Sequence, residues 1–523
     1  MDAVYGLHSA EWSSPDGQAL AEPVGRFEGE IHNLIVFGTI PEEINGTFYR
    51  IMIDPAFPLY PGNPPVEGDG NISAFRIHHG RADMKIKYVE TERYLLEKKA
   101  NQRLFGLYRN PFTHHPCVRA AVDSTANTNL VYWAGHLLAL KEAALPYSVD
   151  PDSLDTLKYD PFGDQVKSQT FTAHPKVDPY TEELVVYGYE AKGLATKDIV
   201  LYALDKEGRK RDEQWIKAPW CASIHDCAIT KNWIILLLWP YEATTIDEMK
   251  GGSQHWEWKQ DRGAAFIIVP RRKDTPRPRG WGTEDFKYYE WDNALTLHSA
   301  SAWEETDNKL YLESVRVMYN VFPSWEKNPT RPDGDLKADF VRWEFDLNQP
   351  SNTRVADPKV ILDLPSEFPR IDERFMSRKY EHIFLPVILP KSTGNFVPLD
   401  LNALAHLNTK TGQVEYFDPG DNCHVAEPIF IPRSKKAEEG DGWVMVMVER
   451  KPTRSSELVV LDTRSFTKPK AVIKLPFMLA RQIHGNWVDQ ASVPHAMESL
   501  VRGTKDVHHE LETSSPLQHC PFG

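Results

Sequence analysis

Four widely separated histidines are the residues of this chain whose sequence setting most suggests metal chemistry. They are His174 in FTAHPKVDP, His225 in SIHDCAI, His298 in LTLHSAS and His484 in QIHGNWVD. Four neutral imidazoles would give a redox-active metal a site without a charged ligand, which suits non-haem iron and oxygen chemistry. None of the four lies in a local metal motif such as HExxH, and the chain has 19 histidines, so spacing alone does not single them out.

Three glutamates stand in settings that would suit residues placed behind such ligands. They are Glu142 in ALKEAALPY, Glu367 in EFPRID and Glu427 in AEPIFIP. A carboxylate behind a metal-binding imidazole fixes the orientation and the tautomer of the ring. Glu367 and Glu427 lie beside apolar residues, where an unpaired charge is costly, so a histidine partner is physically reasonable for both. The alternative is that all three are surface carboxylates.

The sequence around these residues resembles the carotenoid cleavage oxygenase family, and within it most closely the lignostilbene and stilbene dioxygenases. Three further segments carry the resemblance: GTFYR at 46–50, GDGNIS at 68–73 and STANTN at 124–129. The resemblance extends from about Arg26 to Asp489. It implies an all-β fold, namely a seven-bladed β-propeller with a cap of helices and loops over the active site.

The resemblance also implies a role for each candidate residue. All four histidines would bind iron(II), which leaves two of the six octahedral positions for dioxygen or water. The three glutamates would hold three of the ligands, in the pairs Glu142 with His225, Glu367 with His298 and Glu427 with His484. His174 would have no carboxylate. Because the strands of different propeller blades meet at one axis, ligands that are distant in sequence are expected.

Tyr108 in LYRNPF and Lys141 in LLALKE match the residues with which stilbene-cleaving members of the family hold a phenolic hydroxyl. A buried lysine beside a tyrosine could hydrogen-bond or deprotonate a 4-hydroxyphenyl group. The alternatives are a surface lysine on a strand and an aromatic residue used for packing. The turn before GDGNIS reads NPPVEGDG and departs from the stilbene-cleaving relatives, so the mouth of the pocket is expected to differ.

The resemblance thus implies a dioxygenase that uses iron(II) and dioxygen to cleave the alkene C=C bond of 4-hydroxyphenyl substrates to two carbonyl products. The substrates would be stilbenes such as resveratrol or piceatannol, or phenylpropenoids such as isoeugenol and 4-vinylguaiacol. One alternative is cleavage of carotenoids or apocarotenoids, which Tyr108 and Lys141 together disfavour. A second is a propeller that only binds a partner. The presence of all four histidines and all three glutamates argues against this scaffold.

The elements that must position these residues are mainly strands. Apolar and β-branched runs recur at 130–140, 184–189, 199–204, 233–239, 264–269, 310–317, 444–448 and 458–461. Turn residues such as DKEGR and NTKTGQ separate them. Without a βαβ rhythm the choices are sandwich, barrel or propeller, and the length of 523 residues favours a propeller. The helix expected spans 91–107, with Leu95, Leu96, Leu104 and Phe105 on one apolar face.

Composition limits the partners and the compartment. The net charge of -14 argues against a nucleic-acid partner. Five scattered cysteines without a CxxC pair indicate reduced thiols in a cytoplasmic protein. No secretory signal is evident, and the apolar run at 233–239 is too short to cross a membrane, so a buried strand is expected. We expect a small aromatic alkene as the substrate, no stable membrane insertion, and a monomer or weak homo-oligomer.

The chain is expected to form one catalytic propeller domain at 26–502 between an N-terminal extension at 1–25 and a C-terminal tail at 503–523. The tail contains His508, His509, His519 and Cys520, but lacks a second ligand pair at zinc-like spacing. We therefore expect those residues to be solvated. Five other histidines are expected to be hydrogen-bonded structural residues: His78, His79, His114, His115 and His136.

Overall fold

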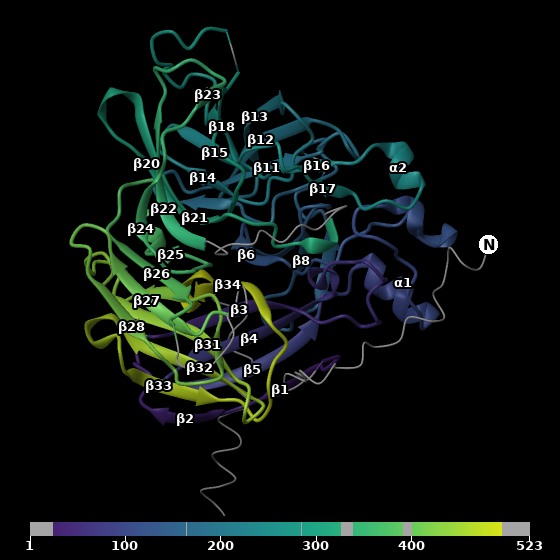
Figure 1. The fold of residues 1–523 in the computed structure, drawn as a ribbon. Coiled ribbons are helices and arrows are strands. Elements are labelled where there is room, and N and C mark those ends of the chain that lie inside the picture. The colour runs from purple at the N-terminus through teal and green to yellow at the C-terminus, as the bar shows by residue number, and fades with distance from the viewer. Residues whose placement is uncertain (1–24, 164, 284, 326–337, 391–399, 494–523) are drawn as a thin grey trace, which may run out of the picture.

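The computed structural model describes residues 25–163, 165–283, 285–325, 338–390 and 400–493. Within them, seven sheets of four to six strands stand around a common axis as the blades of a β-propeller (Figure 1). A separate two-stranded ladder joins β16 (Tyr241–Ala243) to β17 (Trp256–Trp258). The predicted all-β, seven-bladed fold is confirmed.

The blades follow one another along the chain. The strands of the first three, in spatial order, are β1 (Gly29–Ile31), β5 (Arg81–Tyr88), β4 (Gly70–His78), β3 (Gly46–Ile53) and β34 (Gln482–Asp489); β6 (Asn129–Trp133), β7 (His136–Leu140), β8 (Tyr147–Val149) and β9 (Thr156–Tyr159); β10 (Lys176–Asp178), β11 (Glu183–Tyr189), β12 (Asp198–Asp205) and β13 (Lys210–Lys217). Those of the fourth and fifth are β14 (Cys227–Ile229), β15 (Trp233–Leu238), β18 (Ala265–Pro270), β19 (Lys287–Glu290) and β23 (Thr353–Arg354); β20 (Leu295–Glu304), β21 (Lys309–Val317), β22 (Ala338–Asp346) and β24 (Lys359–Leu362). Those of the sixth and seventh are β25 (Arg370–Ile371), β26 (His382–Val387), β27 (Ala403–Asn408) and β28 (Val414–Phe417); β2 (Ile35–Gly38), β33 (Pro469–Lys474), β32 (Ser455–Asp462), β31 (Gly442–Arg450) and β29 (Cys423–Val425), with β30 (Ile429–Pro432) also paired to β31.

Both ends of the described chain close the ring of blades. The second strand, β2, pairs with β33 in the seventh blade, whereas the last strand, β34, pairs with β3 in the first. Opening the ring would therefore break backbone ladders at two places and not only side-chain contacts between blades. This closure supports the innermost strands, which contact one another around the axis from β10 through β14, β20, β25 and β30 to β34 and β6.

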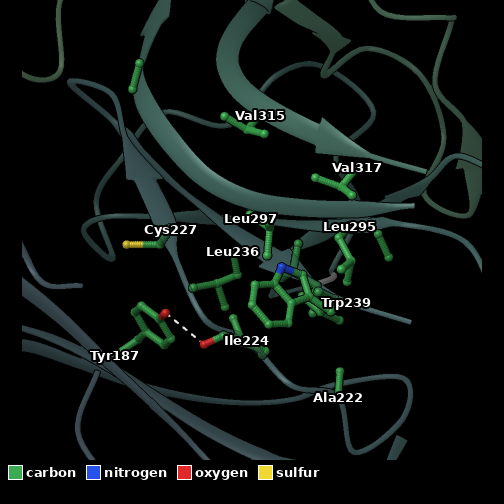
Figure 2. Close-up of a cluster of buried hydrophobic side chains, with 14 of the residues drawn as sticks. Tyr187, Ala222, Ile224, Cys227, Leu236, Trp239, Leu295, Leu297, Val315 and Val317 are labelled. Carbon is green, nitrogen blue, oxygen red and sulfur yellow. Dashed lines mark hydrogen bonds between the residues drawn. The ribbon is translucent and has the colours of Figure 1, made fainter. Parts of the chain in front are cut away.

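The apolar runs of the sequence form the predicted strands. The run at 184–189 lies in β11 and the run at 233–239 supplies β15, and every residue of both strands is buried. The run at 130–140 forms two strands, because Ala134 and Gly135 take positive φ angles of 50° and 81° and turn the chain. Alternating side chains of such strands pack between blades. Figure 2 shows this packing, with Trp239, Leu297 and Val315 coming from neighbouring blades.

Helices are few and lie outside the blades. The helices and 3₁₀ turns are α1 (Glu92–Ala100), α2 (Ile246–Lys250), η1 (Pro65–Glu67), η2 (Pro111–Thr113), η3 (Pro116–Val118), η4 (Thr306–Asn308), η5 (Pro323–Trp325), η6 (Glu373–Phe375), η7 (Thr463–Ser465) and η8 (Gln490–Ser492). None of the helices in the described part of the chain is long and apolar enough to span a membrane.

The helix predicted for 91–107 is shorter than expected, and its predicted apolar face is wrong. Helix α1 ends where Asn101 adopts a left-handed conformation with φ of 50°. Leu95 is 46% exposed, while Leu104 and Phe105 are buried beyond the end of the helix. The helix instead buries Arg93, Tyr94 and Glu97. Ion pairs and hydrogen bonds, which a hydrophobic periodicity cannot reveal, therefore dock this helix.

Four of the five histidines assigned a structural role make side-chain hydrogen bonds away from the axis. The pairs are His78 with Asp83, His114 with Asp123, His115 with Cys117 and His136 with Ser148. His79 packs edge-on against the His78 ring. The predicted tails lie outside the described residues, apart from Gly25, as do the histidines and the cysteine at 508–520.

Candidate active site

The four candidate ligands lie where inner strands begin or bend near the axis. His174 and His225 lie two residues before the first residues of β10 and β14, whereas His298 and His484 lie within β20 and β34. The ladder of β20 with β21 shifts register on both sides of Ser299, and that of β3 with β34 shifts between Arg50 and Met52, opposite the segment with His484. Such irregularities re-aim a side chain relative to its strand. They allow a strand residue to point along the axis.

The structure brings the four imidazoles into one group. One ring nitrogen of each histidine lies within 4.8 Å of the corresponding nitrogen of every other. The Nε2 atom of His225 is 3.1 Å from Nε2 of His174 and 3.1 Å from Nε2 of His298. Neighbouring ligands of an octahedral ion with metal–nitrogen bonds of about 2.1 Å are about 3 Å apart, so the spacing suits one metal ion.

A buried carboxylate lies behind three of the four rings. Glu142 Oε1 accepts a hydrogen bond from Nδ1 of His225, Glu367 Oε2 accepts one of 2.5 Å from His298, and Glu427 Oε1 accepts one of 3.0 Å from His484. Among the residues described here, no carboxylate hydrogen-bonds to the His174 ring. The structure thus assembles the three pairs that the resemblance implied.

The hydrogen bonds of these pairs decide which ring nitrogen is free to bind a metal. An ionised carboxylate can only accept, so a neutral imidazole backed by one carries its proton on Nδ1 and a lone pair on Nε2. The close contact between Nε2 of His225 and Nε2 of His298 then sets two lone pairs against each other. In addition, Nε2 of His484 is buried without a hydrogen-bond partner. A cation at the centre would satisfy all of these atoms.

Burial and the neighbouring charges set the protonation of the site. Burial, followed by the proximity of the other three histidines, holds the pKa of His174 well below its usual range. The pKa of His484 is lowered mainly by burial, although Glu427 opposes the shift. Burial raises the pKa of Glu427, but His484 and Arg370 outweigh it and lower the value to about 2. For His174 and His484 the shifts favour a neutral imidazole. For His298, burial lowers the pKa, but the proximity of Glu367 outweighs burial and raises it.

Asp226 is a positioning residue that the sequence interpretation missed. Its Oδ2 accepts hydrogen bonds of 2.7 Å from both the backbone N–H and the hydroxyl of Ser299, next to His298. Its Oδ1 lies 2.7 Å from Nζ of Lys176. This carboxylate therefore ties the segment of His225 to the strand of His298. Its position directly after His225 was the available sequence signal.

The structure also places Tyr108 and Lys141, the two residues predicted to hold a phenol, next to each other. Lys141 Nζ lies 5.1 Å from the centre of the Tyr108 ring, and both side chains are buried. Lys141 directly precedes Glu142, which contacts His225, so the pair lies on a wall next to the histidine group. Burial, followed by the proximity of Glu142, raises the pKa of Tyr108 above its ordinary range. The Tyr108 hydroxyl therefore remains a neutral donor at physiological pH.

An aromatic wall connects Tyr108 with the histidine group. Tyr108 stacks on Trp325 at 5.8 Å, Trp325 contacts Phe322, Phe322 contacts Trp239, and Trp239 lies 4.9 Å from the His225 ring. The sequence interpretation assigned no role at the site to Trp239, Phe322 or Trp325. The FPSW segment and the tryptophan that closes the apolar run at 233–239 were the available signals.

A cavity of about 300 Å³ reaches the histidine group from a different direction. Its lining includes His174, His298, His484, Lys176 and Arg370. Tyr108 and Lys141 do not line it. The histidine group therefore has one polar neighbourhood with ion pairs and one aromatic neighbourhood with the tyrosine and the lysine.

Comparisons with known proteins agree with this arrangement. The family model described as retinal pigment epithelial membrane protein matches residues 23–489. The resveratrol cleavage oxygenase 1 of Botryotinia fuckeliana (strain B05.10) is 58% identical over 491 residues, which are 93% of this chain and 86% of that protein. The isoeugenol monooxygenase of Pseudomonas nitroreducens is 34% identical over 470 residues, which are 88% of this chain and 96% of that protein. The crystal structure of Pseudomonas brassicacearum lignostilbene dioxygenase matches with a TM-score of 0.84 and 36% identity, over 91% of this chain and 99% of that one.

Proposed function

Because the chain belongs to the retinal pigment epithelial membrane protein family, that of the carotenoid oxygenases, we propose that it is an iron(II)-dependent dioxygenase of phenolic alkenes. It cleaves the C=C bond of a 4-hydroxyphenyl substrate and releases two carbonyl products. The observation that carries this proposal is the placement of Tyr108 and Lys141 beside a group of four histidines, three of them backed by carboxylates.

The histidine group suits iron(II), with His174, His225, His298 and His484 as the ligands. Imidazole also suits zinc and copper, so the preference for iron rests on the family and not on the donor set alone. An iron(II) ion held there would supply the activation of dioxygen for attack on the alkene. Glu142, Glu367 and Glu427 hold three rings in the tautomer that leaves Nε2 free.

The work of Tyr108 and Lys141 is to bind and polarise the phenol. A neutral tyrosine hydroxyl and a lysine ammonium are both hydrogen-bond donors. Two donors at the phenolic oxygen stabilise its ionised form, and the negative charge then spreads through the ring into the conjugated alkene. That alkene becomes electron-rich and more reactive toward an electrophilic oxidant. The aromatic wall formed by Trp239, Phe322 and Trp325 stacks against the flat substrate and excludes water.

The substrate class follows from the phenol-binding pair and from the relatives. The high identity to a protein named resveratrol cleavage oxygenase favours stilbenes such as resveratrol or piceatannol. Isoeugenol and 4-vinylguaiacol are the second candidates, because a protein named isoeugenol monooxygenase is also related. Carotenoids lack a phenolic hydroxyl and would leave the Lys141 ammonium without a substrate partner.

The test is to measure bound iron in the purified protein and to incubate its iron(II) form aerobically with resveratrol and with isoeugenol in parallel. Aldehyde products followed by chromatography are expected from resveratrol, with 4-hydroxybenzaldehyde on the 4-hydroxyphenyl side. Aldehyde from isoeugenol alone would assign the smaller substrates. Bound iron without cleavage of either compound, but with cleavage of an apocarotenoid, would contradict the proposal.

The carboxylates behind the ligands should control metal affinity. Replacing such a residue typically weakens metal binding by about 10–100-fold, and we expect Glu427→Gln to do so. Glu427 receives hydrogen bonds from His484 and from the Gly485 backbone and also pairs with Arg370 at 3.2 Å. Titration of the metal-free protein with iron(II) under anaerobic conditions measures the change.

The matched control for this variant is Glu373→Gln. Glu373 also pairs with Arg370, but it is exposed and forms no ion pair with the ligand histidines. Its replacement should leave iron affinity near the wild-type value. An equal loss of affinity in both variants would show that Arg370, and not the contact between Glu427 and His484, controls the site.

A further inference from the structure

Three segments that are distant in sequence converge on the side chain of Lys141. Nζ of Lys141 lies 3.2 Å from Oδ1 of Asn127 in the STANTN segment and 3.5 Å from Oε2 of Glu67 at the end of η1. All three side chains are buried. The Lys141 ammonium is thus flanked by two acceptor oxygens, those of Asn127 and Glu67, and by the Tyr108 ring.

The orientation of the Asn127 amide is fixed by its own hydrogen bonds. Its Nδ2 donates to the backbone carbonyls of Val66 at 2.8 Å and of Gly68 at 2.6 Å, on either side of Glu67. Both amide protons are therefore used, so Oδ1 must be the atom that faces Lys141. Asn127 thus accepts from the lysine and fixes the backbone that carries Glu67.

The GDGNIS and STANTN segments fit together because of a glycine. Gly70 donates its N–H to the carbonyl of Thr125 at 2.9 Å. A Cβ atom at position 70 would lie 2.4 Å from the carbonyl oxygen of Ala126, a contact that no side chain could tolerate. The GDGNIS segment can therefore approach the STANTN segment closely enough for Glu67 and Asn127 to reach the same lysine.

The two carboxylate oxygens of Glu67 differ in their contacts. Its Oε1 accepts a hydrogen bond of 2.6 Å from Arg93 Nη1, and Arg93 also pairs with Asp123 at 2.9 Å. Its Oε2 is fully buried and has no hydrogen-bond partner, although it is the oxygen nearest to Lys141. Arg93 and Lys141 thus place two positive charges beside the carboxylates of Glu67 and Asp123. Burying an ammonium is costly unless such a counter-charge is present.

We propose that Glu67 is a positioning residue which, together with Asn127, holds Lys141 as an ammonium aimed at the phenolic oxygen of the substrate. An ammonium has three N–H donors. Asn127 accepts one of them, and the ion pair with Glu67 draws the ammonium toward the buried Oε2 atom, which leaves an N–H donor for the substrate. This inference rests on the proposed function of Lys141. It assigns a role in phenol recognition to the turn NPPVEGDG, whose sequence differs from that of the stilbene-cleaving relatives.

The test measures how strongly the protein prefers a phenol to its methyl ether. The dissociation constants of trans-4-hydroxystilbene and trans-4-methoxystilbene are measured without oxygen on the iron-loaded protein, and their ratio is compared among variants. Glu67→Gln should lower the preference for the phenol by about tenfold or more, since hydrogen bonds to charged groups contribute on this scale. Binding of the methyl ether and iron content should not change.

Asp123→Asn is the matched control, because Asp123 shares Arg93 with Glu67 but makes no contact with Lys141. It should keep the wild-type preference. A double variant, Glu67→Gln with Lys141→Met, should show the same preference as Lys141→Met alone, because Glu67 acts through the lysine. Glu67→Asp keeps the charge on a shorter side chain and should show a partly reduced preference, which preserves the test if the glutamine variant does not fold.

Each other outcome overturns the inference. An unchanged preference in Glu67→Gln, or in Glu67→Asp where only that variant folds, would show that Lys141 does not need Glu67. Equal losses in Glu67→Gln and Asp123→Asn would reduce Glu67 to a structural partner of Arg93. An unchanged preference in Lys141→Met would instead contradict the proposed function itself, so the two failures are distinguishable.

Discussion

The His225→Ala variant is expected to bind no iron and to cleave no substrate. Among the contacts between ligand rings, Nε2 of His225 lies 3.1 Å from Nε2 of both His174 and His298. Since residues behind the ligands typically change metal affinity by about 10–100-fold, loss of a ligand itself should cost more than about 100-fold. Elemental analysis of iron per chain, together with turnover of a hydroxylated stilbene, measures the effect.

The alanine variant also leaves Glu142 without its histidine partner, so stability must be separated from metal binding. Glu142 keeps a hydrogen bond of 2.7 Å from the Tyr189 hydroxyl, which offsets part of the loss. His225→Gln retains a polar side chain near Glu142 and should lose iron to a similar degree. His136→Ala removes a histidine bonded only to Ser148 among the contacts described, and should retain iron. Stoichiometric iron in His225→Ala would contradict the four-histidine site.

Much of the fold could be predicted from the sequence, because many of its strands are buried on both faces. The strands β11, β15 and β31 contain runs of consecutive apolar or β-branched residues, and such runs are typical of strands buried on both faces. The number of blades had to come from the resemblance, since the blades share no repeat. The failed prediction of the 91–107 helix has a clear cause, namely that two of its three buried residues, Arg93 and Glu97, are charged.

The site was predictable as a set of residues but not as a geometry. His225 and Glu142 are 83 positions apart, and only the ring of inner strands brings them together. The register shifts near His298 and His484 leave no trace in a hydrophobic pattern, because they depend on how two strands pair. The contact between Glu67 and Lys141 is hidden for the same reason. Sequence shows which groups can do chemistry, whereas topology decides which of them meet.

A change confined to Lys141 should separate metal binding from phenol recognition. Lys141→Met is expected to keep full iron content and to lose activity on 4-hydroxylated stilbenes by about 10²–10⁴-fold, the usual range for removal of a group that moves or stabilises a proton. Methionine retains the length and most of the volume of lysine, so the buried wall next to Tyr108 stays filled. Steady-state kinetics with resveratrol, together with iron analysis, measures the two effects independently.

The control and the contrary result follow from the surroundings of the lysine. Lys287→Met replaces another buried lysine beside an aromatic ring, with Nζ 5.4 Å from the Trp281 ring, on β19 toward the outer edge of the fourth blade, and should leave activity unchanged. Full activity of Lys141→Met on resveratrol would remove phenol activation from the mechanism. The expected loss follows because methionine cannot donate a hydrogen bond, so only the neutral Tyr108 hydroxyl would remain to stabilise the charge that must reach the alkene.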